Sequence, residues 1–278
     1  MKAGDASMTD VTRQPAIYVT HGAGPCFWVN FAEPLGSNAF DGLESHFAGL
    51  LAGSPQRPRA ILIVSAHWEE RLPTVSTAAA PSMLYDYFGF PPHTYELQYP
   101  APGSPELAVH VCDLLQSAGI DVGTDDRRGF DHGVFVPMLV IDPQAGIPVV
   151  TLSLCSDLDP AHHLAIGAAL APLRDEGVLI IGSGSSFHNL RTLFNGDSRA
   201  SVEFDAWLHD TISQTDPVIR RARLVDWKDA PSARACHPRE DHLIPLMVVA
   251  GAAASDPGRS SFRDLIGGKA YSCFAFGA

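Results

Sequence analysis

Three histidines follow closely after apolar, strand-like segments of the chain. The segment AIYVT runs into His21, ILIVSA runs into His67, and VLIIG runs through the small residues SGSSF into His188. In open α/β sheets ligands bind beyond the carboxyl ends of the strands, so these side chains are expected at one edge of a sheet. A single histidine at such a place is usually a capping or hydrogen-bonded residue. Three together favour a metal site, because imidazole is a common protein ligand of zinc and iron.

Two further histidines have acidic neighbours. In RRGFDHGVFVP, His132 follows Asp131, which could fix the ring tautomer, and an apolar run that indicates a new element comes next. In HPREDHLIPLMVVAGAAA a proline indicates a helix start, with Glu240, Asp241 and His242 in its first turns. The two acids could instead only compensate the helix N-terminus, which contributes ~0.3–1 kcal/mol. This segment therefore offers either metal-site residues or a charged helix start.

The rest of the chain predicts an α/β framework for these side chains. Short apolar runs alternate with segments of helical period, a pattern typical of strands joined by crossover helices. We expect a single α/β domain over residues 15–278, in which helices flank a central mixed β-sheet and a metal site lies at the carboxyl ends of strands. Residues 1–14 are expected to form a flexible N-terminal tail. The expected strands are 16–20, 60–66, 75–77, 149–154, 178–182 and 270–275, and the expected helices are 40–51, 105–118, 160–173, 201–214 and 240–254.

The composition limits the partners. The chain has 278 residues and a formal net charge of −12, which would repel a phosphate backbone, so no nucleic acid is expected. Its apolar runs are far shorter than the ~20 residues that span a bilayer, and no apolar signal region begins the chain. We therefore expect a cytoplasmic protein without membrane contact, while a homo-oligomer is left open. Five scattered cysteines without a C-x-x-C pair predict reduced thiols and no zinc–cysteine site.

Motifs for other chemistry are weak or absent. The stretch GSGSS lacks the lysine ending of a phosphate-binding loop and the spacing of a dinucleotide fingerprint, so its glycines are expected to serve a tight strand-to-site turn. No G-x-S-x-G elbow and no H-E-x-x-H pair occurs. Neither a serine hydrolase nor a helix-borne zinc protease is supported.

Seven stretches of the chain carry a family resemblance, and they are, in order, PAIYVTHGAGP, ILIVSAHWEE, YDYFGFPPHTYELQYPAPGSPELA, RGFDHGVFVPML, IPVVTLSL, LIIGSGSSFHNLR and HPREDHLIPLMVVAGAA. In residues and in order they resemble the class III extradiol ring-cleavage dioxygenases, in particular the 4,5-DOPA extradiol dioxygenase branch. The resemblance implies a non-haem Fe(II) oxidoreductase that uses O2 to open an aromatic ring beside two adjacent hydroxyls, on a small DOPA-like or related catechol. It also allows Zn(II) as the bound metal.

The resemblance also implies roles for five histidines. It makes His21, His67 and His242 the metal ligands. His188 matches an active-site histidine that serves as acid/base or as a further ligand, and His132 matches a histidine close to the substrate and O2. With an ordinary pKa of ~6.5, a neutral His188 could accept a phenol proton and later return it.

The third ligand can also be approached from helix geometry. A set of two histidines and one carboxylate, common in Fe(II) oxygenases, would choose Glu240 or Asp241 in place of His242. On a regular helix Glu240 and His242 lie about 200° apart, so only one of them can face the site. The helical spacing of the apolar residues that follow slightly favours His242 as the ligand. We predict His242 as the ligand, which leaves Glu240 available as a partner that holds an imidazole.

Residues 77–106 are rich in both proline and aromatic side chains. The proline content argues against regular elements and the aromatic content against a disordered linker, so we expect an ordered, extended loop. Phe88, Phe90 and Tyr95 in this loop are candidates to wall a flat substrate.

Two other classes of function remain open. A zinc-dependent hydrolase could use the same histidines to lower the pKa of a bound water to ~7. A non-catalytic member of the fold could keep the histidines without turnover. The dioxygenase is favoured, because few of the extra carboxylates that a two-metal hydrolase needs accompany the histidines.

Overall fold

The computed structural model describes residues 12–33, 35–52, 56–193 and 197–277. Residues 1–11 of the predicted tail thus lie outside the described residues. At the described end of that segment Gln14 is buried, with 1% of its surface exposed. Its backbone N–H donates to the carbonyl of Arg174 at 2.9 Å, and its side-chain amide donates to the carbonyl of Gln56 at 3.0 Å. The chain is therefore already packed when the first strand begins.

Within the described residues eight strands form one mixed sheet, in the order β4-β3-β5-β2-β6-β1-β8-β7. The central neighbours β5, β2, β6 and β1 are parallel, whereas β8 and β7 add an antiparallel edge. At the other edge β3 pairs antiparallel with β5 and parallel with β4. The strands are β1 (Ala16–Thr20), β2 (Ala60–Glu70), β3 (Thr74–Ser76), β4 (Gly123–Asp125), β5 (Val149–Cys155), β6 (Val178–Gly184), β7 (Gly258–Ile266) and β8 (Lys269–Phe276).

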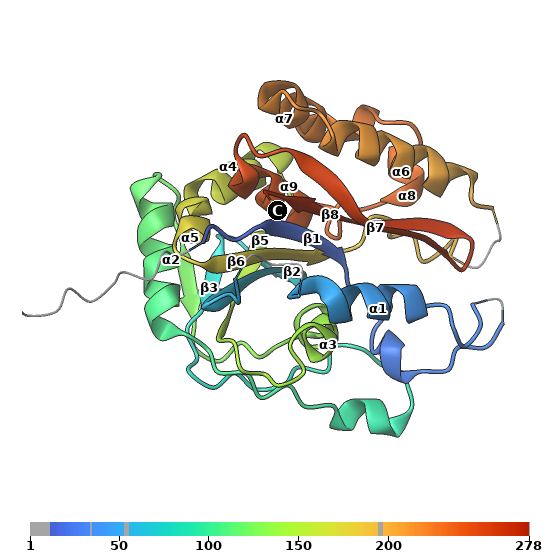
Figure 1. The fold of residues 1–278 in the computed structure, drawn as a ribbon, viewed down its shortest axis with the longest axis horizontal. Coiled ribbons are helices and arrows are strands. Elements are labelled where there is room, and N and C mark those ends of the chain that lie inside the picture. The colour runs from blue at the N-terminus through green and yellow to red at the C-terminus, as the bar shows by residue number, and fades with distance from the viewer. Residues whose placement is uncertain (1–11, 34, 53–55, 194–196, 278) are drawn as a thin grey trace, which may run out of the picture.

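Helices cover both faces of this sheet, which confirms the predicted fold class (Figure 1). On one face lie α1 (Asp41–Leu50) and α3 (His132–Ile141), and on the other lie α4 (Pro160–Leu170) and α9 (Ile244–Ala253), with α6 (Arg199–Ile212) farther along. The remaining helices are α2 (Pro105–Ser117), α5 (Pro172–Asp175), α7 (Pro217–Val225) and α8 (Ala233–Cys236), with 3₁₀ turns η1 (Cys26–Trp28), η2 (Pro92–Glu96) and η3 (Trp227–Asp229). None of the described helices is long and apolar enough to cross a bilayer.

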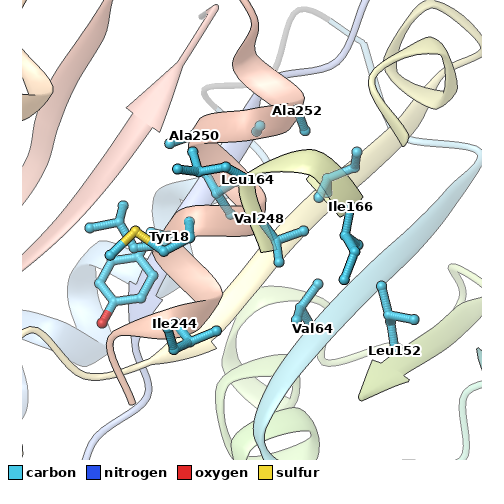
Figure 2. Packing of buried hydrophobic residues seen from close by; sticks show 14 of the residues in the cluster. Tyr18, Val64, Leu152, Leu164, Ile166, Ile244, Val248, Ala250 and Ala252 are labelled. Carbon is cyan, nitrogen blue, oxygen red and sulfur yellow. The ribbon is translucent and has the colours of Figure 1, made fainter. Parts of the chain in front are cut away.

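The helices α4 and α9 are packed against the central strands. Leu164 and Ile166 of α4 and Val248 of α9 meet Val64 of β2 and Leu152 of β5 in one buried cluster (Figure 2). Strands that are covered on both faces need continuous apolar sequence, which is why β2 and β6 read as unbroken apolar runs. This packing holds the carboxyl ends of β1, β2 and β6 in fixed positions.

Several element boundaries differ from those predicted. The edge strand β7 was missed because its sequence GRSSFRDLI is polar and largely exposed, and the three residues of β4 carry no apolar alternation. The helix predicted from residue 240 begins at Ile244. Pro245 occupies its first turn, where the missing N–H of proline is tolerated, so this residue and not the earlier proline marks the helix start.

Candidate metal centre

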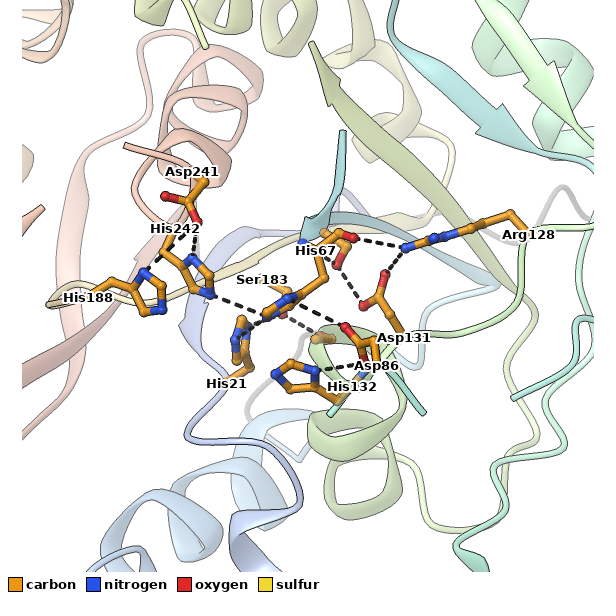
Figure 3. A network of polar contacts seen from close by, with 12 residues as sticks. His21, His67, Asp86, Arg128, Asp131, His132, Ser183, His188, Asp241 and His242 are labelled. Atoms are coloured by element: carbon orange, nitrogen blue, oxygen red, sulfur yellow. Dashed lines mark hydrogen bonds and ion pairs between the residues drawn. The ribbon is translucent and has the colours of Figure 1, made fainter. Parts of the chain in front are cut away.

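Three imidazoles point their Nε2 atoms at one another at the carboxyl ends of the strands (Figure 3). Nε2 of His67 lies 3.1 Å from Nε2 of His21 and 3.3 Å from Nε2 of His242. His21 and His242 are buried, with 1% and 4% of their surfaces exposed. The structure therefore brings together the three side chains that were predicted as ligands.

Each of these histidines reaches the site from a different element. His21 follows β1 directly, and its N–H donates to the carbonyl of Gly184 at 3.0 Å. His67 was predicted to follow its strand, but it lies within the strand, because β2 runs on to Glu70. The pairing of β2 with β5 shifts register between Val64 and Glu69, an irregularity that re-aims a side chain next to a site.

His242 lies in the turn before α9, close against two strands. Its carbonyl accepts hydrogen bonds from the Tyr18 hydroxyl at 2.8 Å and from the Ser185 N–H at 2.9 Å. A Cβ on Gly184 would collide with this carbonyl, so the glycine lets the turn approach the strand. The glycines of GSGSS thus serve close approach inside β6, and not the turn that was predicted.

Polar groups at the far side of each ring determine which nitrogen faces the site. Ser183 donates its hydroxyl proton to the carbonyl of Gly133, so it accepts from Nδ1–H of His21 at 3.0 Å. Asp241 accepts from Nδ1–H of His242 at 2.7 Å. Nδ1 of His67 lies 3.5 Å from a carboxylate oxygen of Asp86. With a proton on Nδ1, each neutral ring presents the lone pair of Nε2 to the centre.

Burial keeps these rings neutral. It lowers the pKa of His21 and of His242 well below the ordinary histidine value, and it lowers the pKa of His67 to about 3, with the neighbouring histidines adding to the effect. Three lone pairs then converge without a proton between them. A divalent cation satisfies such a donor set, because neutral imidazole is the form that binds metal.

His132 lies beside this group but is held by a different carboxylate from the one predicted. Its Nδ1 donates to Asp86 at 2.8 Å, and its backbone N–H donates to the same oxygen at 2.9 Å. Asp131, the sequence neighbour, instead accepts from Ser65 at 2.8 Å and from Arg128 at 2.8 Å. Although burial alone would raise it, the pKa of Asp86 falls to about 2 through the hydrogen bond and charge of His132.

His188 stacks on His242, with ring centroids 3.4 Å apart and an angle of 16° between the rings. Its Nδ1 lies 3.9 Å from the carboxylate of Asp241, which also holds His242. Burial lowers the pKa of His188 below the ordinary value. A neutral ring at the edge of the centre can accept a proton.

The helix-periodicity argument for the third ligand was wrong, because residues 240–243 form a turn before α9 and not its first turns. Glu240 holds no imidazole: its carboxylate lies 2.5 Å from Arg234 and 3.6 Å from Lys228. Asp241, which was considered above only as a possible ligand, takes that role for His242. A turn allows consecutive side chains to face one site, which a helix does not.

A cavity of about 270 Å³ opens onto the histidines. His21, His67, His132, His188 and His242 line it together. Among the three aromatic side chains predicted to wall a substrate, only Phe90 is found in the lining. Phe88 is 92% exposed, and Tyr95 packs against Tyr85 and Tyr87.

Sequence reasoning missed Asp86 and Ser183 as residues of this centre, and it missed the orienting role of Asp241. Asp86 lies between two tyrosines of the aromatic loop, in YDYFGF, and an acid between aromatic side chains was a usable signal. Ser183 lies inside an apolar strand, where a buried hydroxyl requires a partner.

The fold and this cluster of imidazoles and carboxylates define a metal-dependent α/β protein. A family model described as the catalytic LigB subunit of aromatic ring-opening dioxygenase matches residues 15–271. The 4,5-DOPA dioxygenase extradiol of Beta vulgaris is 43% identical over 205 residues, which cover 72% of this chain and 75% of that protein. The protein of the same name from Escherichia coli K12 is 36% identical, covering 87% and 86%.

Two further comparisons agree with these. The dioxygenase tasH of Hapsidospora irregularis is 38% identical over 258 residues, covering 86% of this chain and 78% of that protein. The crystal structure of an uncharacterized Escherichia coli K12 protein superposes with a TM-score of 0.75 at 31% identity, over 95% of this chain and all of that one. The chain belongs to the LigB family of aromatic ring-opening dioxygenases. It is an extradiol ring-cleavage dioxygenase, a metal-dependent class, as the sequence predicted.

Proposed function

We propose that this protein is a non-haem Fe(II)-dependent dioxygenase that opens the ring of a catechol-type substrate with O2. The observation that carries the proposal is the convergence of three neutral imidazole Nε2 atoms from His21, His67 and His242 at 3.1 and 3.3 Å. The relatives named 4,5-DOPA dioxygenase extradiol support a substrate with two adjacent phenol hydroxyls.

His21, His67 and His242 would hold the metal. Fe(II) bound by three protein ligands supplies Lewis acidity for two adjacent hydroxyl oxygens and the redox chemistry that O2 requires. Ser183, Asp86 and Asp241 keep the three rings in the tautomer and orientation that this needs, since each takes the Nδ1 side of one ring.

His188 and His132 would handle protons in the proposed reaction. Since its pKa lies below the ordinary value, His188 stays neutral near pH 7 and can accept a phenol proton, then return it to the leaving oxygen. His132 donates Nδ1–H to Asp86, so its Nε2 is the free nitrogen toward the cavity. Phe90 lines the same cavity and would contact the flat face of the ring.

Oxygen uptake tests this proposal. Protein loaded anaerobically with Fe(II) should hold about one metal per chain and consume one O2 per ring opened when a catechol is added. Zinc-loaded protein is the control and should bind catechols without oxygen uptake. Absence of uptake with every catechol, or zinc-dependent hydrolysis without oxygen use, would contradict the proposal.

A further inference from the structure

The cavity wall outside the histidines is mostly apolar. Among the described residues that line it, none is Asp, Glu, Lys or Arg. Arg191 is a chain neighbour of the cavity, but its side chain is exposed and does not line it. The apolar and aromatic side chains of the wall are Leu35, Phe40, Phe90, Phe187, Leu190, Leu193, Ile266 and Tyr271.

Three polar side chains of the lining already have partners within the protein. The Thr20 hydroxyl donates to the Ser272 carbonyl at 3.0 Å, and the Ser185 hydroxyl donates to the Phe187 carbonyl at 2.7 Å. The Asn189 amide donates to the Ala235 carbonyl at 2.7 Å. A charged substituent on the substrate would therefore lose hydration in this cavity without gaining an ionic partner, which is costly.

Leu190 marks the side of the cavity that meets solvent. It is 67% exposed, whereas Phe187 and Ile266 are only 3% and 2% exposed. Elsewhere in the lining, the turn after His21 fits closely against Phe90, since a Cβ on Gly24 would lie 2.9 Å from the Phe90 ring. A ring substituent that extends from the histidines toward solvent thus meets an apolar surface up to the mouth.

We propose that the preferred substrate is a catechol whose ring substituent is uncharged and apolar, such as a short alkyl chain. This inference rests on the proposed function and refines its substrate class. DOPA, which appears in the names of the relatives, carries a carboxylate and an ammonium group for which the described lining offers no counter-charge. The cavity volume of about 270 Å³ lies just below the range of ~300–1,000 Å³ that is usual for small-molecule sites, and it suits a single substituted ring.

The test compares three catechols with side chains of equal length. They are 4-propylcatechol, 3-(3,4-dihydroxyphenyl)propionate, which adds one carboxylate, and DOPA, which adds an ammonium as well. With Fe(II)-loaded protein, kcat/KM for the propyl compound should exceed both others by at least roughly tenfold, mainly through KM. Equal or higher kcat/KM for either charged compound would overturn the inference while leaving the proposed function intact.

Binding gives a second readout that does not depend on turnover. Titration calorimetry with zinc-loaded protein should rank the three Kd values in the same order. If no compound is opened, the proposed function fails. The Kd ranking then decides the inference alone, and tighter binding of a charged compound overturns it.

A charge added at the mouth provides a matched variant. Leu190→Lys should raise kcat/KM for the propionate relative to the propyl compound by roughly two- to fivefold, since an exposed ion pair contributes little. Val218→Lys is the control, because Val218 is 73% exposed on α7 and lines a different cavity. The same ratio in wild type and Leu190→Lys would contradict the position inferred for the substituent.

Discussion

Two cavities lie at opposite ends of the same strands. At the amino ends of β2 and β6, Ala60 and Val178 line a cavity of about 470 Å³, whereas the histidine cavity at the carboxyl ends measures about 270 Å³. The larger one contains charged groups, among which Glu176 has two partners: it lies 3.0 Å from Arg59 and 2.9 Å from His110.

The difference shows what distinguishes a reactive centre from a polar surface. At the amino ends Glu176 pairs with Arg59 and His110, and these three side chains are 36–59% exposed, so water screens them. At the carboxyl ends buried imidazoles direct lone pairs at one another and their protons away, toward Ser183, Asp86 and Asp241. Converging nitrogen lone pairs with no proton between them, more than the size or the charge of a cavity, indicate a metal-binding centre.

The largest effect is expected from removing one of the convergent donors. His67→Ala should abolish tight binding of Fe(II) or Zn(II), because its Nε2 lies between those of His21 and His242. His110→Ala, at the other end of the sheet, should leave about one metal per chain. Metal analysis after dialysis measures both variants. Equal metal content in the two would contradict the assignment of metal binding to the histidine cavity.

Loss of His188 should separate proton transfer from metal binding. His188→Ala is expected to lower kcat by ~10²–10⁴-fold while the metal content stays near that of wild type. Because burial lowers the pKa of His188, wild-type activity should fall only below pH ~6.5, as the ring gains a proton and can no longer accept one. Steady-state rates across pH and metal analysis provide the check. Parallel loss of metal and activity would show that His188 acts mainly as a metal ligand and not as the acid/base.

A smaller effect is expected from the carboxylate behind His242. Asp241→Ala should weaken metal binding by ~10–100-fold, since the ring loses the partner of Nδ1 at 2.7 Å. Glu240→Ala is the matched control, because Glu240 pairs with Arg234 outside the centre. Competition with a chelator of known affinity yields both constants. A larger loss of metal affinity in the Glu240 variant would show that Glu240, and not Asp241, orients His242.

The sequence predicted the central strands and the gathering of the histidines, because apolar runs and their ends are local signals. It did not predict the partners of the rings. Asp86 lies 46 residues from His132, and Ser183 lies 162 residues from His21, so only the packed sheet brings each pair together. The error at Glu240 had a local cause, since Pro245 moved the helix start and replaced helical spacing by a turn.

The smallest effect is expected at the amino-end cavity. Glu176→Gln removes the charge shared by Arg59 and His110, yet the free energy of unfolding should change by no more than ~1 kcal/mol, because exposed pairs gain little over their hydrated states. Urea unfolding at low and at high salt measures this, and the difference from wild type should shrink in salt as screening increases. Metal affinity, measured on the same samples, should not change. A weakened metal site would show that the strands transmit this charge to the histidines, and the two ends of the sheet would no longer be independent.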